Sequence, residues 1–336
     1  MSKKAVLLLN LGTPDDCHPQ AVRRYLKEFL NDPRVIDLPS AARWLLVNAI
    51  IVPFRYKKSA AAYAKIWEAK GSPLLTNTEA MQNALADELG PDYHIELGMR
   101  YGNPSIQSAL EKLSNASELL ILPLFPQYSS AATGSAVEKT LGCIIKRWNV
   151  PELTVVRDFY NDPGFIAAYA DVIHQHTADK NIDLLLFSYH GLPERHITKS
   201  DCQAVCDHLH ACPVVDDKNR FCYRAQCYAT SQLLAASLKL TPAQYAVAFQ
   251  SRLGRTPWIK PYTDKLLPEL IQKGVKNIAV ACPSFVADCL ETLEEVNIRT
   301  RAQWQALGGQ AFYFIPCLNA SPVWIQALAG IVKKNS

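Results

Sequence analysis

A histidine at the end of an apolar run is the first feature of this chain that could do chemistry. His190 follows the apolar residues 184–187 and precedes the polar, turn-forming segment 191–194. Four apolar residues in a row predict a buried strand, and in open α/β sheets ligands bind beyond the carboxyl ends of the strands. A histidine at such a place can ligate a metal or take a proton near neutral pH. Alternatively, His190 caps a turn and has no further role.

A row of carboxylates is the second such feature. Asp288, Glu291 and Glu295 follow the apolar run 277–282. On an α-helix, with about 100° per residue, they would lie within about 60° of one another. Acidic residues near a helix start also favour the helix dipole, so helix electrostatics is the alternative interpretation. A histidine and a carboxylate row that both follow strands of the same half could meet in one cleft and form a proton or metal site.

The third feature is a cysteine-rich insert, 200–227, which contains half of the ten cysteines of the chain. These are Cys202, Cys206, Cys212, Cys222 and Cys227. Four thiolates can hold Zn²⁺ or an iron–sulfur cluster, and the spacing alone does not decide between them. Because the apolar run 5–9 is too short for a signal peptide, we expect reduced cysteines and favour metal binding over disulfides. Unrelated free cysteines are the remaining alternative.

The elements that must position these residues are strand-like apolar runs that alternate with helical patterns. Strands are expected at 5–9, 94–101, 118–124, 153–157, 183–189, 245–250, 277–282 and 312–316. Helices are expected near 16–31, 59–68, 76–89, 104–114, 133–148, 163–178, 226–239, 258–273, 289–307 and 320–333. Strand–helix alternation predicts parallel sheets covered on both faces, and two groups of four strands predict two similar α/β halves.

The length of the chain, 336 residues, allows two domains of ordinary size. The expected domains are 1–160 and 161–317, with the boundary near 158–163. The last segment, 318–336, is expected to form a helix that crosses back to the first domain.

The composition is that of a soluble globular protein, with 49% hydrophobic and 20% charged residues. A net charge of +4 is too small to indicate a nucleic-acid partner. Together with the missing signal peptide, this composition predicts a cytoplasmic location.

One apolar stretch needs a separate interpretation. Residues 45–54 are almost wholly apolar but too few to span a bilayer. Four basic residues flank the stretch: Arg43, Arg55, Lys57 and Lys58. A buried helix is one interpretation. The other is an apolar lip, 41–56, that contacts a hydrophobic ligand or makes a peripheral contact with the anionic inner face of the cell membrane.

Several motifs, taken together and in order, resemble the ferrochelatases, the family that inserts ferrous iron into protoporphyrin IX. The motifs lie at 9–14 (LNLGTP), 98–101 (GMRY), 122–129 (LPLFPQYS), 188–193 (SYHGLP), 249–254 (FQSRLG), 257–258 (PW) and 288–295 (DCLETLEE). The resemblance covers essentially the whole chain. It implies two Rossmann-like domains, each a four-stranded parallel sheet flanked by helices, with a porphyrin cleft between them.

The resemblance also implies roles for single residues. His190 and Glu291 match the catalytic histidine and glutamate, and Asp288 and Glu295 match the acidic row beside them, so these four are the expected metal residues. The positions implied to line the porphyrin pocket are Leu11, Arg100, Tyr101, Tyr128 and Trp258. The stretch 41–56 matches the lip around the cleft mouth.

The cysteine-rich insert is similar to that of a bacterial subgroup with an internal [2Fe–2S] cluster. The segment around Cys227 resembles one that occurs in relatives without a cluster. The resemblance therefore implies Cys202, Cys206, Cys212 and Cys222 as the ligands. A structural zinc ion is the alternative.

The expected activity is the insertion of ferrous iron, as substrate, into protoporphyrin IX to give protoheme, the terminal step of heme biosynthesis. A chelatase for another metal or a more carboxylated porphyrin is the nearest alternative, and a carrier of tetrapyrroles or metals without catalysis is another. A nucleotide-dependent α/β enzyme is disfavoured, because the loop 10–14 lacks the G-x-G-x-x-G pattern.

Overall fold

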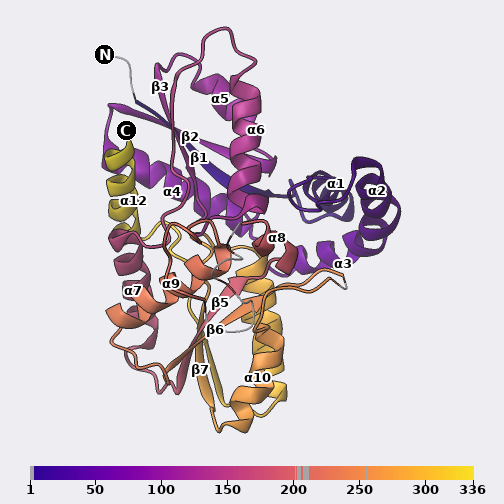
Figure 1. Cartoon of the computed structure of the whole chain (residues 1–336), viewed down its shortest axis with the longest axis vertical. Coiled ribbons are helices and arrows are strands. Elements are labelled where there is room, and N and C mark those ends of the chain that lie inside the picture. Colours follow the sequence, from indigo (N-terminus) through magenta and orange to yellow (C-terminus); the bar gives the residue numbers. More distant parts are fainter. Residues whose placement is uncertain (1–3, 201, 203–205, 207–211, 255) are drawn as a thin grey trace. The chain divides into compact units, whose positions relative to one another are not determined.

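The apolar runs and helical patterns fold into two α/β units, each with a four-stranded parallel sheet and helices around it (Figure 1). The computed structural model describes residues 4–200, 202, 206, 212–254 and 256–336. Unit 1 comprises Met1–Phe125, Ser130–Arg157 and Asn319–Ser336, and unit 2 comprises Pro126–Ser129 and Asp158–Leu318.

The sheet of unit 1 has the strand order β2-β1-β3-β4. Its strands are β1 (Lys4–Thr13), β2 (Tyr93–Gly102), β3 (Glu118–Pro123) and β4 (Glu152–Val155). Residues 5–10 of the central strand β1 are all buried. A strand covered on both faces has no solvent side, which explains the unbroken apolar run in the sequence.

Unit 1 contains seven α-helices and two π-helical segments among its described residues. The α-helices are α1 (Pro19–Leu30), α2 (Ser40–Leu45), α3 (Val52–Ala64), α4 (Pro73–Leu89), α5 (Ile106–Lys112), α6 (Ser135–Ile144) and α12 (Pro322–Asn335). The π-helical segments are η1 (Leu46–Ile51) and η2 (Ser130–Gly134). In Figure 1, α1, α2 and α3 lie together beyond the end of β1. The C-terminal helix α12 packs against α4 and so belongs to unit 1.

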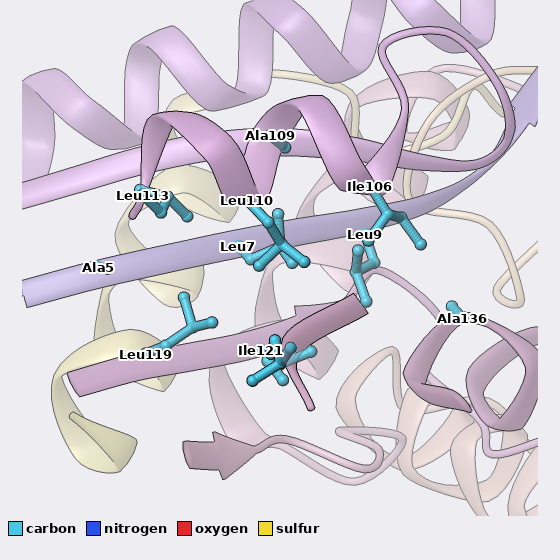
Figure 2. Close-up of a cluster of buried hydrophobic side chains, with 11 residues drawn as sticks. Ala5, Leu7, Leu9, Ile106, Ala109, Leu110, Leu113, Leu119, Ile121 and Ala136 are labelled. Atoms are coloured by element: carbon cyan, nitrogen blue, oxygen red, sulfur yellow. The ribbon is translucent and has the colours of Figure 1, made fainter. Parts of the chain in front are cut away.

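One hydrophobic core cluster of unit 1 lies between its sheet and the helices α5 and α6. Leu7 and Leu9 of β1 and Ile121 of β3 meet Ile106 and Leu110 of α5 (Figure 2). All five are at most 1% exposed, and burial of each such side chain stabilises the fold by about 1.5–3 kcal/mol.

Unit 2 repeats this arrangement with the strand order β6-β5-β7-β8. Its strands are β5 (Leu184–His190), β6 (Tyr245–Gln250), β7 (Asn277–Ala281) and β8 (Ala311–Phe314). Its helices are α7 (Pro163–Thr177), α8 (Glu194–Thr198), α9 (Tyr223–Ser237), α10 (Thr263–Gln272), the π-helix η3 (Glu291–Thr300) and α11 (Arg301–Ala306). The same strand order in both units confirms the expectation of two similar halves.

The local signals that start the helices of unit 2 are visible at α7. The side chain of Asp162 accepts hydrogen bonds from the backbone N–H groups of Gly164 and Phe165, and Pro163 occupies the first helical position. Both features are typical of helix N-termini.

All eight expected strands are confirmed, and most expected helices begin and end within a few residues of their predicted bounds. The helix expected at 258–273 begins only at Thr263. Pro257 and Pro261 explain the difference, because the residue before a proline avoids the α-helical region. The short helices α2 and α8 were not predicted. No helix of the described part of the chain is long and apolar enough to cross a membrane.

Candidate active site

His190 is the last residue of β5, at the carboxyl end of the sheet of unit 2. Its ring atom Nδ1 lies 2.6 Å from the carbonyl oxygen of Gly191. Because a carbonyl can only accept a hydrogen bond, this contact assigns the proton to Nδ1 and leaves the lone pair on Nε2. A neutral imidazole in this tautomer can ligate a metal or accept a proton through Nε2.

The main chain of His190 is held at both of its polar groups. Its N–H donates to Ser284 Oγ at 3.2 Å, and its carbonyl accepts a hydrogen bond from the hydroxyl of Tyr223 at 2.9 Å. Gly191 follows, and its N–H donates to the carbonyl of Gln250 at 2.6 Å. A Cβ at position 191 would lie 2.9 Å from that same oxygen, so the close approach requires glycine.

Aromatic rings lie beside the imidazole of His190. The ring centroids of Trp258 and Phe285 are 6.5 and 6.4 Å from it. Trp258 is half-buried, and its indole N–H donates to the carbonyl of Leu253 at 3.1 Å. The segment that carries Trp258 pairs with the segment after His190 through a bridge to Pro193. A polar ring nitrogen with aromatic neighbours suits a flat, largely apolar ligand.

Asp288 lies before the helix and not on it, which corrects the geometry expected from the sequence. The helix that follows, η3, begins at Glu291 and has π-helical hydrogen bonds, so the spacing of about 100° per residue does not apply to it. Asp288 is buried, and its carboxylate accepts a hydrogen bond from Thr292 Oγ1 at 2.9 Å. The backbone N–H of Cys317 lies 3.3 Å from both carboxylate oxygens.

Glu295 is held by a serine in a strained conformation. Its two carboxylate oxygens accept hydrogen bonds from the N–H of Ser251 at 3.0 Å and from its hydroxyl at 2.5 Å. Ser251 has φ +63°, a left-handed conformation that costs a residue other than glycine on the order of 1–3 kcal/mol. The two hydrogen bonds to Glu295 help to offset that cost.

Gln250 connects the histidine side of the site with the carboxylate side. It ends β6, and its carbonyl accepts from Gly191, the residue after the histidine. Its side-chain Nε2 donates to the carbonyl of Glu291 at 3.1 Å, and its Oε1 accepts from Ser188 at 2.6 Å. Glu291 itself is half-buried, and the buried thiol of Cys289 lies beside it; burial and then Glu291 raise the pKa of that thiol.

Glu294, on η3, is a buried carboxylate of the segment 288–295. It is 4% exposed and lies 2.7 Å from Nε of Arg299. Glu294 is therefore a buried ion-pair partner rather than a solvent-facing residue.

Within the described residues, no three side chains of the His, Cys, Asp or Glu types form a group arranged to hold a metal ion. The metal roles expected of His190, Glu291, Asp288 and Glu295, and the cluster expected on the four cysteines of the insert, therefore stay predictions. What the structure does bring together is His190 with Trp258, and Glu295 with Ser251.

Two expected porphyrin-binding residues in unit 1 share a buried polar network around Asp32. The guanidinium of Arg100 lies 2.5 Å from Asp32 Oδ2 and also bonds to Ser135, and the hydroxyl of Tyr101 donates to the same oxygen at 2.8 Å. Burial acts to raise the pKa of Asp32, but hydrogen bonds from Ser135, the Arg34 amide and Tyr101, with the charge of Arg100, lower it below its usual value.

The burial of Tyr101 limits how it can act. Its side chain is 0% exposed, so in this structure it supports the ion pair of Arg100 and Asp32 instead of presenting a surface. Leu11 is half-buried, and its N–H donates to Asn10 Oδ1 at 2.8 Å. In unit 2, the N–H of Tyr128 donates to Gln226 Oε1 at 2.6 Å, and its ring packs edge-on against Phe221.

Four cysteine thiols of the insert gather close enough to influence one another. Cys202 and Cys222 are buried, and Cys206 and Cys212 are half-buried. Burial raises the pKa of Cys202 to about 12, with Cys222 and Cys206 as further contributors. Burial likewise raises the pKa of Cys212 to about 11, although the nearby guanidinium of Arg224 opposes this.

The fifth cysteine of the insert, Cys227, lies on α9 and is fully buried. It too is within electrostatic reach of Cys212 and Cys222. Parts of the insert, 201, 203–205 and 207–211, lie outside the described residues.

The fold is that of the chelatases. SirB from Bacillus subtilis with Fe³⁺ superposes with a TM-score of 0.54 at 11% sequence identity, over 99% of this chain and 95% of SirB. The sirohydrochlorin chelatase SirB in complex with cobalt, from Bacillus subtilis subspecies spizizenii, gives a TM-score of 0.55 at 10% identity, over 99% and 94% of the two chains. At such low identity the likeness concerns the fold alone.

Sequence comparison is more specific. The profile of the ferrochelatase family matches residues 3–336. The ferrochelatase of Legionella pneumophila (strain Lens) is 55% identical over 333 residues, which cover 99% of each chain. That of Coxiella burnetii (strain CbuK_Q154) is 51% identical over 337 residues, covering 99% of this chain and 94% of the relative. This chain belongs to the ferrochelatase family.

Several residues that hold the site together had not been singled out in the sequence. Gln250 ends strand β6 just as His190 ends β5, and Ser251 follows it, so their place at the end of a strand was a usable signal. Tyr223 and Asp32 gave no local signal, because each acts through partners that are distant in sequence.

Proposed function

We propose that His190 and Glu291 carry the metallation reaction of this enzyme. As a member of its family, the chain is a metal-chelatase lyase of heme synthesis that inserts ferrous iron into protoporphyrin. The observation that supports His190 is its fixed tautomer, in which Nδ1 is engaged by Gly191 and Nε2 keeps its lone pair beside the ring of Trp258.

Metallation removes two protons from the pyrrole nitrogens while the iron ion exchanges its water for ring nitrogens. The lone pair of His190 Nε2 suits it to accept a proton or to ligate the incoming iron. Asp288 and Glu295 have oxygens engaged by protein donors. We assign to these two carboxylates the attraction of the cation over a longer range, and to Glu291 direct proton or iron exchange.

For the porphyrin, we propose contacts with Trp258 and Tyr128 in unit 2. Both are half-buried aromatic residues, and such side chains suit a large apolar macrocycle. Leu11 and Arg100 of unit 1 are proposed contacts too, and Tyr101 is proposed to act by holding Arg100 through Asp32. A bent macrocycle exposes its nitrogen lone pairs, so a pocket that favours a bent ring would speed metallation.

We further propose that Cys202, Cys206, Cys212 and Cys222 hold a [2Fe–2S] cluster. The chemistry of the donor set supports this assignment, because four thiols are the usual ligands of such a cluster and these four lie close enough to affect one another. When bound, the cluster would supply a one-electron redox centre and cross-link the insert. Zinc, which prefers the same thiolates, is the competing occupant.

A peripheral membrane contact through the lip 41–56 is the last part of the proposal. The buried-helix interpretation does not account for the exposure of this stretch: Trp44, Leu45, Ile50 and Phe54 are 62, 57, 53 and 83% exposed. Exposed apolar side chains flanked by basic residues suit an anionic lipid surface. We propose a cytoplasmic enzyme that meets the inner face of the cell membrane reversibly.

The proposal is tested by an anaerobic assay of the purified enzyme with a panel of metals and porphyrins. Ferrous iron with protoporphyrin IX is expected to give the highest kcat/KM, read as the loss of porphyrin fluorescence. Faster turnover with cobalt or with a more carboxylated porphyrin would favour another chelatase activity. Porphyrin binding without turnover would favour a carrier.

A further inference from the structure

The first turn of α9 joins the cysteine-rich insert to the surroundings of His190. Cys222, a proposed cluster ligand, is the residue just before the helix, and Tyr223 and Arg224 are its first two residues. Both of the latter are buried, at 6 and 7% exposure. Three consecutive residues thus contain a proposed ligand and two side chains that bond to the metallation site or to the loop beside it.

Tyr223 contacts the proposed catalytic residue directly through its main chain. Its hydroxyl donates to the carbonyl of His190 at 2.9 Å, while Ser284 accepts from the N–H of the same residue. Loss of that hydroxyl would leave a part-buried carbonyl with one partner fewer, which costs stability and fixes the histidine less tightly.

Arg224 bonds to the insert and to the loop of Trp258 at the same time. Its Nη1 donates to Cys212 Sγ at 3.1 Å, and its Nε donates to the carbonyl of Lys260 at 3.4 Å. Its guanidinium also lies 5.1 Å from the ring centroid of Tyr228. Lys260 is two residues after Trp258, so a single side chain spans from a proposed ligand to the proposed porphyrin contact.

The contact between Arg224 and Cys212 is electrostatic, because the guanidinium of Arg224 is buried. A buried cation is stable only when anionic or strongly polar partners replace its water. The sulfur of Cys212, as a thiolate bound to iron, would supply such a partner. A donor hydrogen-bonded to a cluster sulfur stabilises the more negative, reduced cluster and so raises its reduction potential.

We propose that Arg224 and Tyr223 are positioning residues that tie the cluster-bearing insert to the porphyrin site. Arg224 holds Cys212 against the loop of Trp258, and Tyr223 holds the main chain of His190. The inference rests on the proposed function, because it takes Cys212 as a ligand and Trp258 and His190 as parts of the metallation site.

The test compares Arg224→Gln with Lys218→Gln in the whole, anaerobically purified enzyme. Lys218 lies in the same insert but is exposed, so its replacement makes the same charge change at the surface. Two quantities are measured: the midpoint potential of the cluster, by dithionite titration followed by electron paramagnetic resonance, and the porphyrin Kd, by fluorescence.

Arg224→Gln is expected to lower the midpoint potential and to weaken porphyrin binding by about tenfold, the size of one lost charge-assisted hydrogen bond. Lys218→Gln should leave both unchanged. Arg224→Lys keeps the charge without the planar fork and should give an intermediate midpoint potential and an intermediate porphyrin Kd. It takes the place of Arg224→Gln in the comparison if the glutamine variant does not fold. Equal potentials and equal Kd values for the two glutamine variants would overturn the role of Arg224.

Tyr223→Phe tests the second half of the proposal. It should lower kcat and leave the porphyrin Kd and the iron and sulfide content near those of the parent enzyme; an unchanged kcat would overturn the role of Tyr223. If the parent enzyme itself contains zinc or no metal, the cluster assignment fails on its own. The porphyrin Kd of Arg224→Gln, compared with that of Lys218→Gln, then still decides the positioning role.

Discussion

At the scale of single residues, the tautomer of His190 is the feature with the clearest chemical consequence. A methyl group can neither accept a proton nor ligate iron, so His190→Ala is expected to lose metallation by at least about two orders of magnitude, the usual scale for acid–base residues. Fold and porphyrin binding should remain, because the replaced ring is only half-buried. Anaerobic iron insertion and porphyrin Kd are measured separately.

The matched control for this variant is His174→Ala, which removes an exposed imidazole from α7 in the same unit. It should behave like the parent enzyme in both assays. Near-normal turnover of His190→Ala would show that the reaction does not need this imidazole.

Substitutions of two neighbouring glutamates, Glu291 and Glu294, are expected to affect different properties: turnover for Glu291 and stability for Glu294. Glu291→Gln keeps the shape and removes the charge, so it should cut turnover strongly with little change in Tm. Glu294 was not part of the expected carboxylate row, and it is buried against Arg299. We expect Glu294→Gln to lower the free energy of unfolding by about 1–3 kcal/mol and to leave the turnover of folded enzyme near normal. Equal loss of turnover in both variants would show that Glu291 has no special role.

At the scale of elements, the strands could be predicted from sequence and the π-helices could not. A strand buried on both faces is an unbroken apolar run, which is why β1 and β5 were recognisable. A π-helix such as η3 uses the same residues as an α-helix and differs only in its i→i+5 hydrogen bonds, which a pattern of period 3.6 does not encode. The carboxylates were therefore found, but the place of Asp288 before the helix and the burial of Glu294 were not.

The lip, 41–56, exposes four large apolar side chains, those of Trp44, Leu45, Ile50 and Phe54. The double change Ile50→Glu with Phe54→Glu should reduce sedimentation with anionic liposomes by about tenfold or more, because each of these side chains loses the gain of entering the lipid. Folding should be unaffected, since both side chains are more than half exposed.

The control for the lip is Trp148→Glu, which removes another exposed apolar side chain of unit 1, 98% exposed, from outside the lip. It should sediment with liposomes like the parent enzyme. If the double variant also sediments normally and its KM for porphyrin is unchanged, the lip is an inert surface.

The insert is the element whose ligand assignment is most directly testable. Cys212→Ser should lose the iron and sulfide, because a missing thiolate leaves the cluster an open ligand position. Cys227→Ser should retain about two irons and two sulfides per chain, as a [2Fe–2S] cluster requires. Metal and sulfide analysis of anaerobically purified protein is the measurement. Stoichiometric zinc without sulfide would show that the insert holds a structural zinc ion instead of a cluster. Loss of the cluster in Cys227→Ser would show that Cys227 is one of the ligands.

At the scale of the whole molecule, the chain leaves unit 1, builds unit 2 and returns at Asn319 to complete unit 1 with α12. The apolar pattern of the last helix was enough to predict a helix there. Its partner is α4, and that pairing joins residues far apart in the sequence. The stability of unit 1 therefore depends on residues 319–336, which follow unit 2 in the sequence.

The substitution Leu328→Ala tests how strongly the stability of unit 1 depends on α12. It is 0% exposed, and removal of a buried leucine side chain costs about 2–5 kcal/mol through lost apolar burial and the cavity left behind. Leu328→Ala is therefore expected to lower the Tm in calorimetry, and Lys333→Ala, an exposed change on the same helix, is the control that should leave it unchanged. The cluster content should stay the same in both variants, because the insert belongs to unit 2. A Tm equal to that of the parent enzyme in Leu328→Ala would mean that unit 1 holds its fold without the help of its C-terminal helix.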